Sequence, residues 1–275
     1  MRTHRIVPVL LLLLGSLSIN SARAETHATC TGFIDSIPAT INTQGVWCLR
    51  KDASTSVTSG AAITVNTNNV TIDCNGFKVG GLAAGNGSKT SGIFADGRQN
   101  TTIRRCNLRG FHHGILLQGD TGGHLVEHNR IDNSLAVGID VRGSRNLIQH
   151  NSVFDTGGAP DSFSSIAISA GGDVVDNQVE GVFAVWADAY VFGIDLTDAT
   201  GTARDNRIRN LTPNGSGRAI GISGLANASS AVGNHVAAAY FVVQGVGISS
   251  IRACANNTVA SFTTSYSCSA SVGNL

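Results

Sequence analysis

The chain has 275 residues, of which only 13% are charged, and its formal net charge is +1. Only three residues are lysine. A nucleic-acid-binding protein usually shows a basic excess or a basic patch, so this composition argues against nucleic acid as a partner.

Residues 1–24 predict a secretory signal peptide. Arg2 and Arg5 precede an apolar run over residues 6–14, and small residues up to Ala24 offer a cleavage site. A membrane anchor is the alternative interpretation, but polar residues interrupt the run too early for a span. No later stretch is apolar enough to cross a bilayer. We therefore expect an exported protein, secreted or periplasmic.

After an N-terminal segment without a repeat, polar residues recur at intervals of 22 to 31 residues. The expected rungs of this ladder are Asn75, Cys106, Asn129, Asn151, Asn177, Asn206, Asn234 and Asn257. A mostly apolar or small residue stands three positions before each rung, and an apolar residue stands two positions after it. Asparagine tolerates the unusual backbone conformation of a bend, and stacked amides can hydrogen-bond to one another. A period of this size indicates stacked structural repeats.

A second column of segments alternates with the ladder and has the two-residue period of strands. These segments begin at Gly92-Ile93, Gly114-Ile115, Gly138-Ile139, Ser165-Ile166, Gly193-Ile194, Ala219-Ile220 and Gly245-Val246. β-Branched residues dominate them, and short turns rich in Gly, Asn and Asp separate them from their neighbours. Each repeat is therefore expected to contain one Gly-Ile strand and a strand on each side of the rung.

The repeated pattern resembles the right-handed parallel β-helix of the pectate-lyase-like superfamily, over roughly residues 60–262. The expected fold is an all-β, single-stranded parallel β-helix of about seven to eight coils with terminal caps. A leucine-rich repeat needs more leucine than this chain has. A nonapeptide calcium roll needs Gly-Gly-x-Gly-x-Asp runs, which this sequence does not contain. A left-handed hexapeptide helix needs a six-residue period, which is also missing.

Caps are expected at residues 25–59 and 263–275. All six cysteines follow the signal peptide, and an even number in an exported chain predicts disulfides. The expected pairs are Cys30 with Cys48, Cys254 with Cys268, and Cys74 with Cys106. The third pair bridges neighbouring coils about 4.8 Å apart, but a one-position offset leaves it open. Zinc is the alternative, although no Cys-x-x-Cys spacing supports it.

The superfamily places its polysaccharide-binding cleft on the face formed by the strands that follow the variable loops. The resemblance therefore implies that the Gly-Ile strands carry any site. If each Ile points inward, the expected outward column is Phe94, Leu116, Asp140, Ala167, Asp195, Gly221 and Gly247. Asp140 and Asp195 would then lie two coils apart, about 9–10 Å.

That separation is close to the ~6.5–9.5 Å between the two carboxyls of inverting glycoside hydrolases. Asp140 and Asp195 could act as general acid and base, or could together hold a calcium ion. Arg142 could neutralise an acidic sugar, and His113 could supply a base. The alternative is that both carboxylates are solvated surface groups and that Arg142 forms an ordinary surface ion pair with Asp140.

Trp186, Asp188 and Tyr190 precede the Asp195 strand and could line the groove, because aromatic rings pack well on sugar rings. They could equally form the core of a folded-back loop. His128 and His150, each next to a rung, would stack about 4.8 Å apart and could share a metal ion, although an ordinary surface ladder is the simpler interpretation.

No specific enzyme family is matched. The chain lacks the Arg-x-Pro-x-x-Arg of well-known pectate lyases, the adjacent Asp-Asp of polygalacturonases and the Asp-Pro-His-Glu of epimerases. The leading hypothesis is a monomeric carbohydrate-active protein that binds a polysaccharide along the Gly-Ile face. Cleavage of that polysaccharide, by a lyase or a hydrolase reaction, is the enzymatic form of this hypothesis. The alternatives are a non-catalytic adhesive or glycan-binding protein and a periplasmic metal-handling protein.

Overall fold

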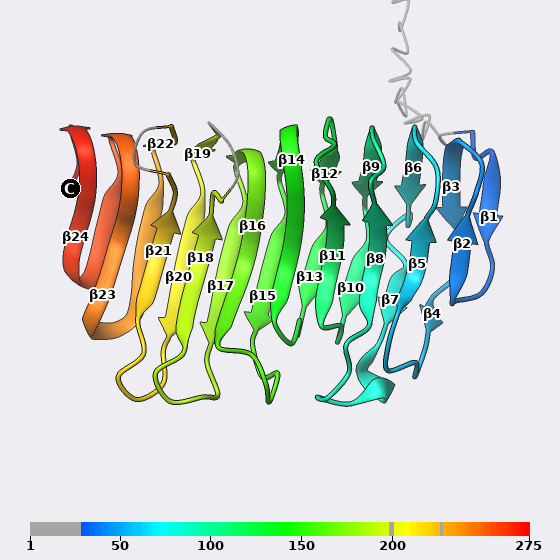
Figure 1. Ribbon diagram of the computed structural model, residues 1–275, viewed down its shortest axis with the longest axis horizontal. Helices are drawn as coiled ribbons and strands as arrows, with labels where there is room; N and C mark the ends of the chain where they lie inside the picture. The colour runs from blue at the N-terminus through cyan, green and yellow to red at the C-terminus, as the bar shows by residue number, and fades with distance from the viewer. Residues whose placement is uncertain (1–28, 198–200, 226–227) are drawn as a thin grey trace, which may run out of the picture.

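The computed structural model describes residues 29–197, 201–225 and 228–275, and the predicted signal peptide lies outside these ranges. The 24 strands found in these ranges all belong to one sheet, and the strands of successive coils pair in parallel. The coils stack in chain order along the long axis of the molecule (Figure 1). The only helical element in the described ranges is a single 3₁₀ turn, η1 (Leu82–Ala84), so the predicted all-β parallel β-helix is confirmed.

Each coil contributes a strand to each of three faces. The Gly-Ile face is built from β2 (Ala39–Ile41), β5 (Ala61–Val65), β8 (Ser91–Asp96), β11 (His113–Gln118), β14 (Val137–Gln149), β16 (Ser164–Val175), β18 (Tyr190–Asp195), β21 (Ala219–Ser223) and β23 (His235–Ala255). The face before the ladder contains the ends of β14, β16 and β23 and the strands β1 (Gly32–Ile34), β3 (Gly45–Leu49), β6 (Val70–Asp73), β9 (Thr101–Arg104), β12 (Leu125–Glu127), β19 (Thr202–Arg204) and β22 (Ser230–Val232).

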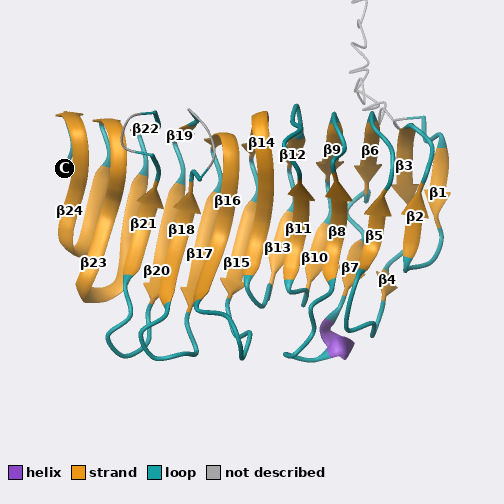
Figure 2. Ribbon diagram, viewed as in Figure 1, coloured by secondary structure: helices purple, strands orange, loops and turns teal. Residues whose placement is uncertain are grey.

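The face after the ladder contains the start of β23 and the strands β4 (Ala53–Ser54), β7 (Lys78–Gly80), β10 (Asn107–Arg109), β13 (Arg130–Asp132), β15 (Ser152–Thr156), β17 (Gln178–Phe183) and β20 (Arg207–Thr212). The last strand, β24 (Thr258–Val272), pairs with β23. The longer loops all precede the Gly-Ile strands and protrude along one edge of the rod (Figure 2). Within the described ranges, no helix has the length and apolar character needed to cross a membrane.

The core consists of aliphatic side chains stacked in register from coil to coil. On the Gly-Ile face, the fully buried positions that pair with one another include Ile93, Ile115, Ile139, Ile168, Ile194, Ile222 and Ile248. Every coil thus buries its apolar side chains against the coils above and below it. A single coil could not form this core alone.

The residue before each of these isoleucines must be very small. A Cβ built at Gly138 would lie 2.5 Å from the carbonyl oxygen of Ala167, and one at Gly193 would lie 2.5 Å from that of Gly221. The same close approach recurs at Gly114, where the distance to the carbonyl oxygen of Gly138 would be 2.6 Å. The recurrent glycine of the sequence therefore reflects backbone contact between neighbouring coils.

The asparagine ladder is a continuous chain of buried hydrogen bonds. The side-chain oxygen of each asparagine accepts the backbone N–H of the preceding rung at 2.8–3.0 Å, from Cys106–Asn129 through to Asn257–Asn274. Each amide nitrogen then donates to backbone carbonyls of its own or the preceding coil, as Asn177 does to Ile148 at 2.9 Å. The ladder thereby satisfies polar groups that the bend would otherwise bury without partners.

The strained backbone position of the bend precedes the rung, which corrects the predicted role of asparagine there. Positive φ angles occur at Arg105, His128, His150, Asp176, Asp205, Gly233 and Asn256. The side chain of the rung points inward to hydrogen-bond, while the residue before it adopts the left-handed conformation.

Asn75 is not a rung of this ladder, contrary to the prediction. Val79, not Phe77, pairs with Leu108, so two additional residues lie in the first bend. Asn75 itself has a φ of 50°, and its amide donates to the carbonyl of Leu49 at 3.0 Å. The insertion leaves Phe77 at the position that Cys106 occupies in the next coil.

All three predicted disulfides are present. The pairs are Cys30–Cys48, Cys74–Cys106 and Cys254–Cys268. Cys74 and Cys106 have their Cα atoms 4.6 Å apart, and the bridge joins two coils at the start of the ladder. Residues assigned to the caps also pair with coil strands, through β2 and β5 at one end and β23 and β24 at the other.

Asn177→Ala is expected to lower the free energy of unfolding by about 2–4 kcal/mol. The substitution removes the acceptor of the Asn151 N–H at 2.9 Å and leaves the buried carbonyl of Val175 without its 3.0 Å donor. Equilibrium urea denaturation measures the change. Asn86→Ala, on an exposed turn, is the control and should change stability by less than about 0.5 kcal/mol. Equal stability of the two variants would contradict a structural role for the ladder.

Candidate functional site

The outward column of the Gly-Ile face differs from the predicted one in three coils. Ser169 pairs with both Asp140 and Asp195, and Ser223 and Ser249 continue the column. Ala167, Gly221 and Gly247, predicted in these places, instead occupy the close-contact glycine position. The prediction was two residues out of register because Ile166, Ile220 and Val246 resemble the buried isoleucine that follows two residues later.

Asp140 and Asp195 do lie in one column, two coils apart, with a serine between them. At about 4.8 Å per coil, their backbones are about 9–10 Å apart. Asp140 is nearly buried, with a side chain that is 6% exposed, and it accepts a 3.4 Å contact from the Arg142 guanidinium. Arg142 itself is exposed, so the face presents the cation more than the carboxylate beneath it.

A second polar group lies at the start of the same strands. Lys89 contacts Nε2 of His112 at 3.2 Å and pairs with Asp161. Nδ1 of His112 lies 3.0 Å from Nδ1 of His113, the first residue of β11. The pKa of His112 is lowered to about 4 by burial, then by the nearby His113 and Lys89. Burial also lowers the pKa of His113 to about 4, and the charges of Arg142 and Lys89 act in the same direction.

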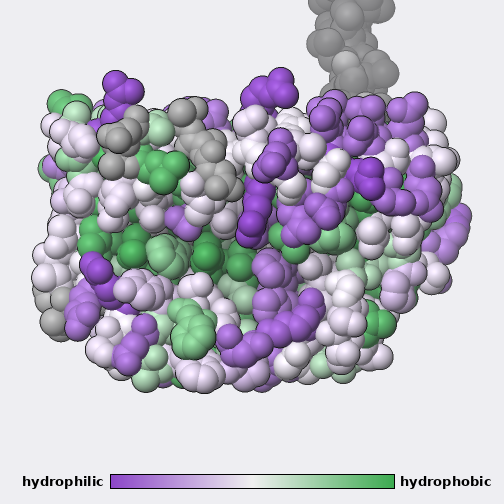
Figure 3. Space-filling model, viewed as in Figure 1, coloured by the Kyte–Doolittle hydropathy of each residue, from purple (hydrophilic) through white to green (hydrophobic). Residues whose placement is uncertain are grey.

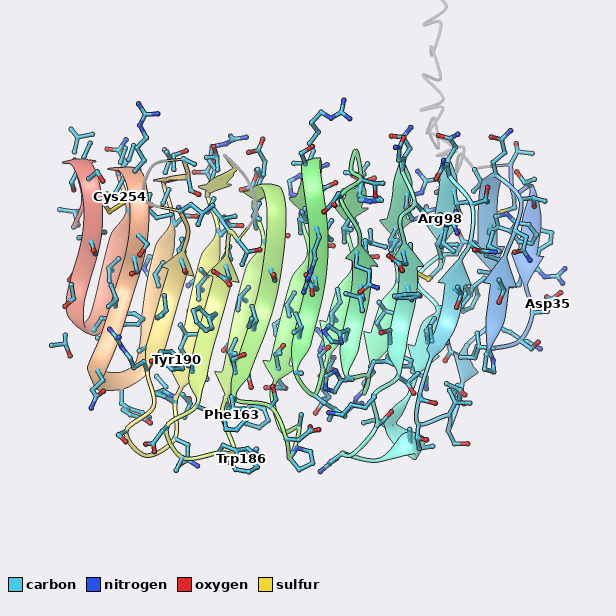
Figure 4. All side chains as sticks on the ribbon, viewed as in Figure 1. Asp35, Arg98, Phe163, Trp186, Tyr190 and Cys254 are labelled. Atoms are coloured by element: carbon cyan, nitrogen blue, oxygen red, sulfur yellow. A yellow bond between two sulfur atoms is a disulfide. The ribbon has the colours of Figure 1, made fainter. Side chains whose placement is uncertain are left out.

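The loops beside this face carry exposed aromatic rings, two of which form a pair. Trp186 is 43% exposed and packs against Phe163, 73% exposed, with ring centroids 5.5 Å apart. The Trp186 indole N–H donates to the carbonyl of Pro160 in the neighbouring loop. Tyr190 is 41% exposed and stacks on Phe192 at 6.1 Å, nearer to the strands than the loop pair (Figure 4). Trp186 and Tyr190 are thus accessible at the loop edge of the face.

Between the loops and the Asp140 column runs a column of apolar side chains. Its members, paired from coil to coil, are Val137, Ile166, Phe192, Ile220 and Val246. All except Val246 are partly exposed. An apolar band runs along the molecule in this part of the surface (Figure 3). A contiguous apolar surface of this kind marks a candidate interaction site.

The carboxylate of Asp188 accepts a hydrogen bond from the hydroxyl of Ser216 in the next loop. The backbone N–H of Asp188 donates to the carbonyl of Asn214 at 3.1 Å, so Asp188 joins two loops. The rings of His128 and His150 are tilted by 37° with centroids 5.1 Å apart, close to the separation expected for adjacent coils. Among the described residues, no group of three or more His, Cys, Asp or Glu side chains is arranged to hold a metal ion.

Sequence reasoning missed Lys89, Asp161 and Phe163 as members of this surface. Lys89 and Asp161 are 72 residues apart and meet because the loops before β8 and β16 extend along the same edge. No local motif marks such a pair. Phe163 could have been noticed as an aromatic residue in an otherwise polar turn.

Between pH 6.5 and about 4, stability is expected to fall as the pH is lowered. An unfolded histidine binds a proton near pH 6.5, whereas the folded pKa values of His112 and His113 are about 4, so protons favour the unfolded chain. The slope contributed is up to about 1.4 kcal/mol per pH unit for each histidine. Urea denaturation at several pH values measures it. His113→Gln should flatten the slope, and Asn86→Ala, on an exposed turn, should leave it unchanged. A slope unaltered by His113→Gln would contradict the lowered pKa.

Comparison with known proteins identifies the fold family but no specific activity. No curated protein matches the chain. One solved structure with a similar fold is DFA-IIIase from Arthrobacter chlorophenolicus A6 in complex with GF2, at 12% identity, covering 79% of this chain and 68% of that one with a TM-score of 0.38. Another is the Dettilon tailspike protein, at 12% identity, covering 87% of this chain and 60% of that one with a TM-score of 0.33. A family model described as a right-handed β-helix region matches residues 91–264, more than half of the chain, so the protein belongs to the right-handed β-helix family.

Proposed function

We propose that the protein binds a polysaccharide along its Gly-Ile face. The observation that carries the proposal is the continuous apolar column from Val137 to Val246, with exposed aromatic rings along one side and polar side chains along the other. Sugar rings have apolar faces that pack on aromatic and aliphatic surface, while their hydroxyls need hydrogen-bonding groups beside it. A linear glycan lying along the rod would meet both.

The outward column supports binding as the first role. Ser223 and Ser249 are partly exposed and offer hydroxyls that can donate to or accept from sugar hydroxyls, whereas Ser169 is mostly buried. The three disulfides and the predicted signal peptide support an exported protein, because disulfides persist in oxidising compartments. A non-catalytic glycan-binding or adhesive role requires only these binding groups and no catalytic residue on this face.

Trp186→Ala and Tyr190→Ala are each expected to weaken polysaccharide binding about tenfold or more, because each removes exposed aromatic surface beside the column. Affinity electrophoresis against a panel of acidic and neutral polysaccharides measures the change. The matched control is Phe33→Ala, an exposed aromatic in β1 at the other end of the rod. A panel in which wild-type protein binds nothing, or in which Phe33→Ala has the same effect, would refute the proposed surface.

Cleavage of the bound glycan is a second candidate, favoured by the position of Asp140 and Asp195 in one column. Their backbone separation of about 9–10 Å leaves room for a glycosidic bond and a water molecule between the carboxyls. One carboxyl would protonate the departing glycosidic oxygen, and the other would take the proton of the attacking water. A lyase would instead use a base beside the sugar ring.

Asp140→Asn and Asp195→Asn are each expected to reduce any depolymerising activity at least about 100-fold while binding persists, because an amide cannot exchange the proton. Reducing-end release and unsaturated-product absorbance distinguish hydrolysis from elimination. Asp120→Asn, at an exposed position after β11, is the control. Activity that survives in both aspartate variants would exclude this pair, and binding without any product would leave the non-catalytic role as the conclusion.

A further inference from the structure

Four side chains from three separate segments form a line of contacts at the loop edge of the Gly-Ile face. Asp161 lies in the loop before β16, Lys89 lies before β8, and His112 and His113 lie where β11 begins. Asp161 accepts from Lys89, Lys89 reaches Nε2 of His112 at 3.2 Å, and Nδ1 of His112 reaches Nδ1 of His113 at 3.0 Å. Each contact joins two nitrogen or oxygen atoms that can hydrogen-bond.

The chemistry of the lysine fixes the direction of every bond in this line. An ammonium group only donates, so Nε2 of His112 must be the acceptor and carries no proton. A neutral imidazole with a bare Nε2 carries its proton on Nδ1, and that N–H then donates to Nδ1 of His113. His113 therefore accepts at Nδ1, which leaves its own proton on Nε2.

We propose that Asp161, Lys89 and His112 hold His113 as a neutral imidazole whose Nε2–H donates a hydrogen bond to ligand on the Gly-Ile face. Asp161, Lys89 and His112 are positioning residues, and His113 is the binding residue. This assignment revises the expectation that His113 acts as a base, because its only lone pair is already used by His112. That the acceptor is a glycan oxygen rests on the proposed function, whereas the proton positions do not.

The surroundings of the pair agree with neutral rings. Burial lowers the pKa of both histidines to about 4, so both are unprotonated at neutral pH. The charged groups that act on them are Lys89 and Asp161 at His112 and Lys89 and Arg142 at His113. A third histidine provides an internal reference, because Nδ1 of the buried His124 accepts the backbone N–H of Thr101 at 3.2 Å and its proton is therefore on Nε2.

The test is a long-range ¹H–¹⁵N correlation spectrum of the full chain at pH 7, which distinguishes the two neutral tautomers of each histidine. We expect His112 to be the Nδ1–H form and the adjacent His113 the Nε2–H form, with His124 also Nε2–H. Substitutions His112→Gln and His113→Gln assign the signals. The opposite tautomers of two adjacent rings are the signature, because a ring without a fixed partner has no reason to adopt the Nδ1–H form.

Lys89→Met should abolish the Nδ1–H signature of His112 and alter the His113 pattern, while His124 stays unchanged. Lys89→Arg should restore it, because a guanidinium also only donates. Lys78→Met is the matched control, since Lys78 pairs with Asp52 and has the same 47% side-chain exposure as Lys89.

An Nε2–H form of His112 in the wild-type protein, or a signature that survives Lys89→Met, would overturn the inference whether or not a polysaccharide binds. A signature that is intact and depends on Lys89, in a protein that binds none of the polysaccharides tested, would confirm the proton arrangement and overturn only the glycan as the acceptor. The two proposals therefore fail by different measurements.

Discussion

Hydrogen bonding between coils at the asparagine ladder is the interaction on which the rest of the structure depends. The side chain of each rung is almost completely buried and both accepts from one neighbour and donates to the next, as the Asn151 amide does with Asn129 and Asn177. A buried bend without such partners would leave backbone groups unsatisfied at a cost of about 1–3 kcal/mol each. Because every rung requires the next, the ladder sets one register, and a slip would break bonds in two coils together.

A fixed register determines which surface residues meet. Asp140, Ser169 and Asp195 are far apart in sequence yet form one column, because their buried neighbours are held in line. Length varies most in the loops before the Gly-Ile strands, where backbone can extend into solvent without disturbing the ladder (Figure 2). Those loops bring Lys89 beside Asp161. The part of the surface that varies most in length therefore lies next to the regular Gly-Ile face.

The period of the ladder was enough to predict the fold and the three strands of each coil, because a regular repeat in the sequence indicates stacked coils. The disulfides were predicted from the even number of cysteines in an exported chain, with the Cys74–Cys106 pair left open. The position of individual residues within each coil was harder to predict from the sequence. Asn75 fits the sequence pattern but lies in a bend with two extra residues, and Ile166 fits the Gly-Ile pattern but lies two residues before the buried Ile168. In both cases a residue of the expected type lies within a few positions of the residue that the structure places in the column. Contacts made by loops, including the Lys89–His112 contact, leave no periodic trace and could not be predicted.

The charges at the loop edge bear on what the face can recognise. Lys89 is paired with Asp161, and Arg142 with Asp140, while His112 and His113 are held neutral by burial. Opposite charges in contact largely cancel at a distance, particularly at physiological salt. Directed hydrogen-bond donors and the apolar column remain as the features that the proposed polysaccharide would meet along the face. Such a surface would select a ligand by its shape and by the placement of its acceptor oxygens more than by its net charge, which fits a chain with few charged residues.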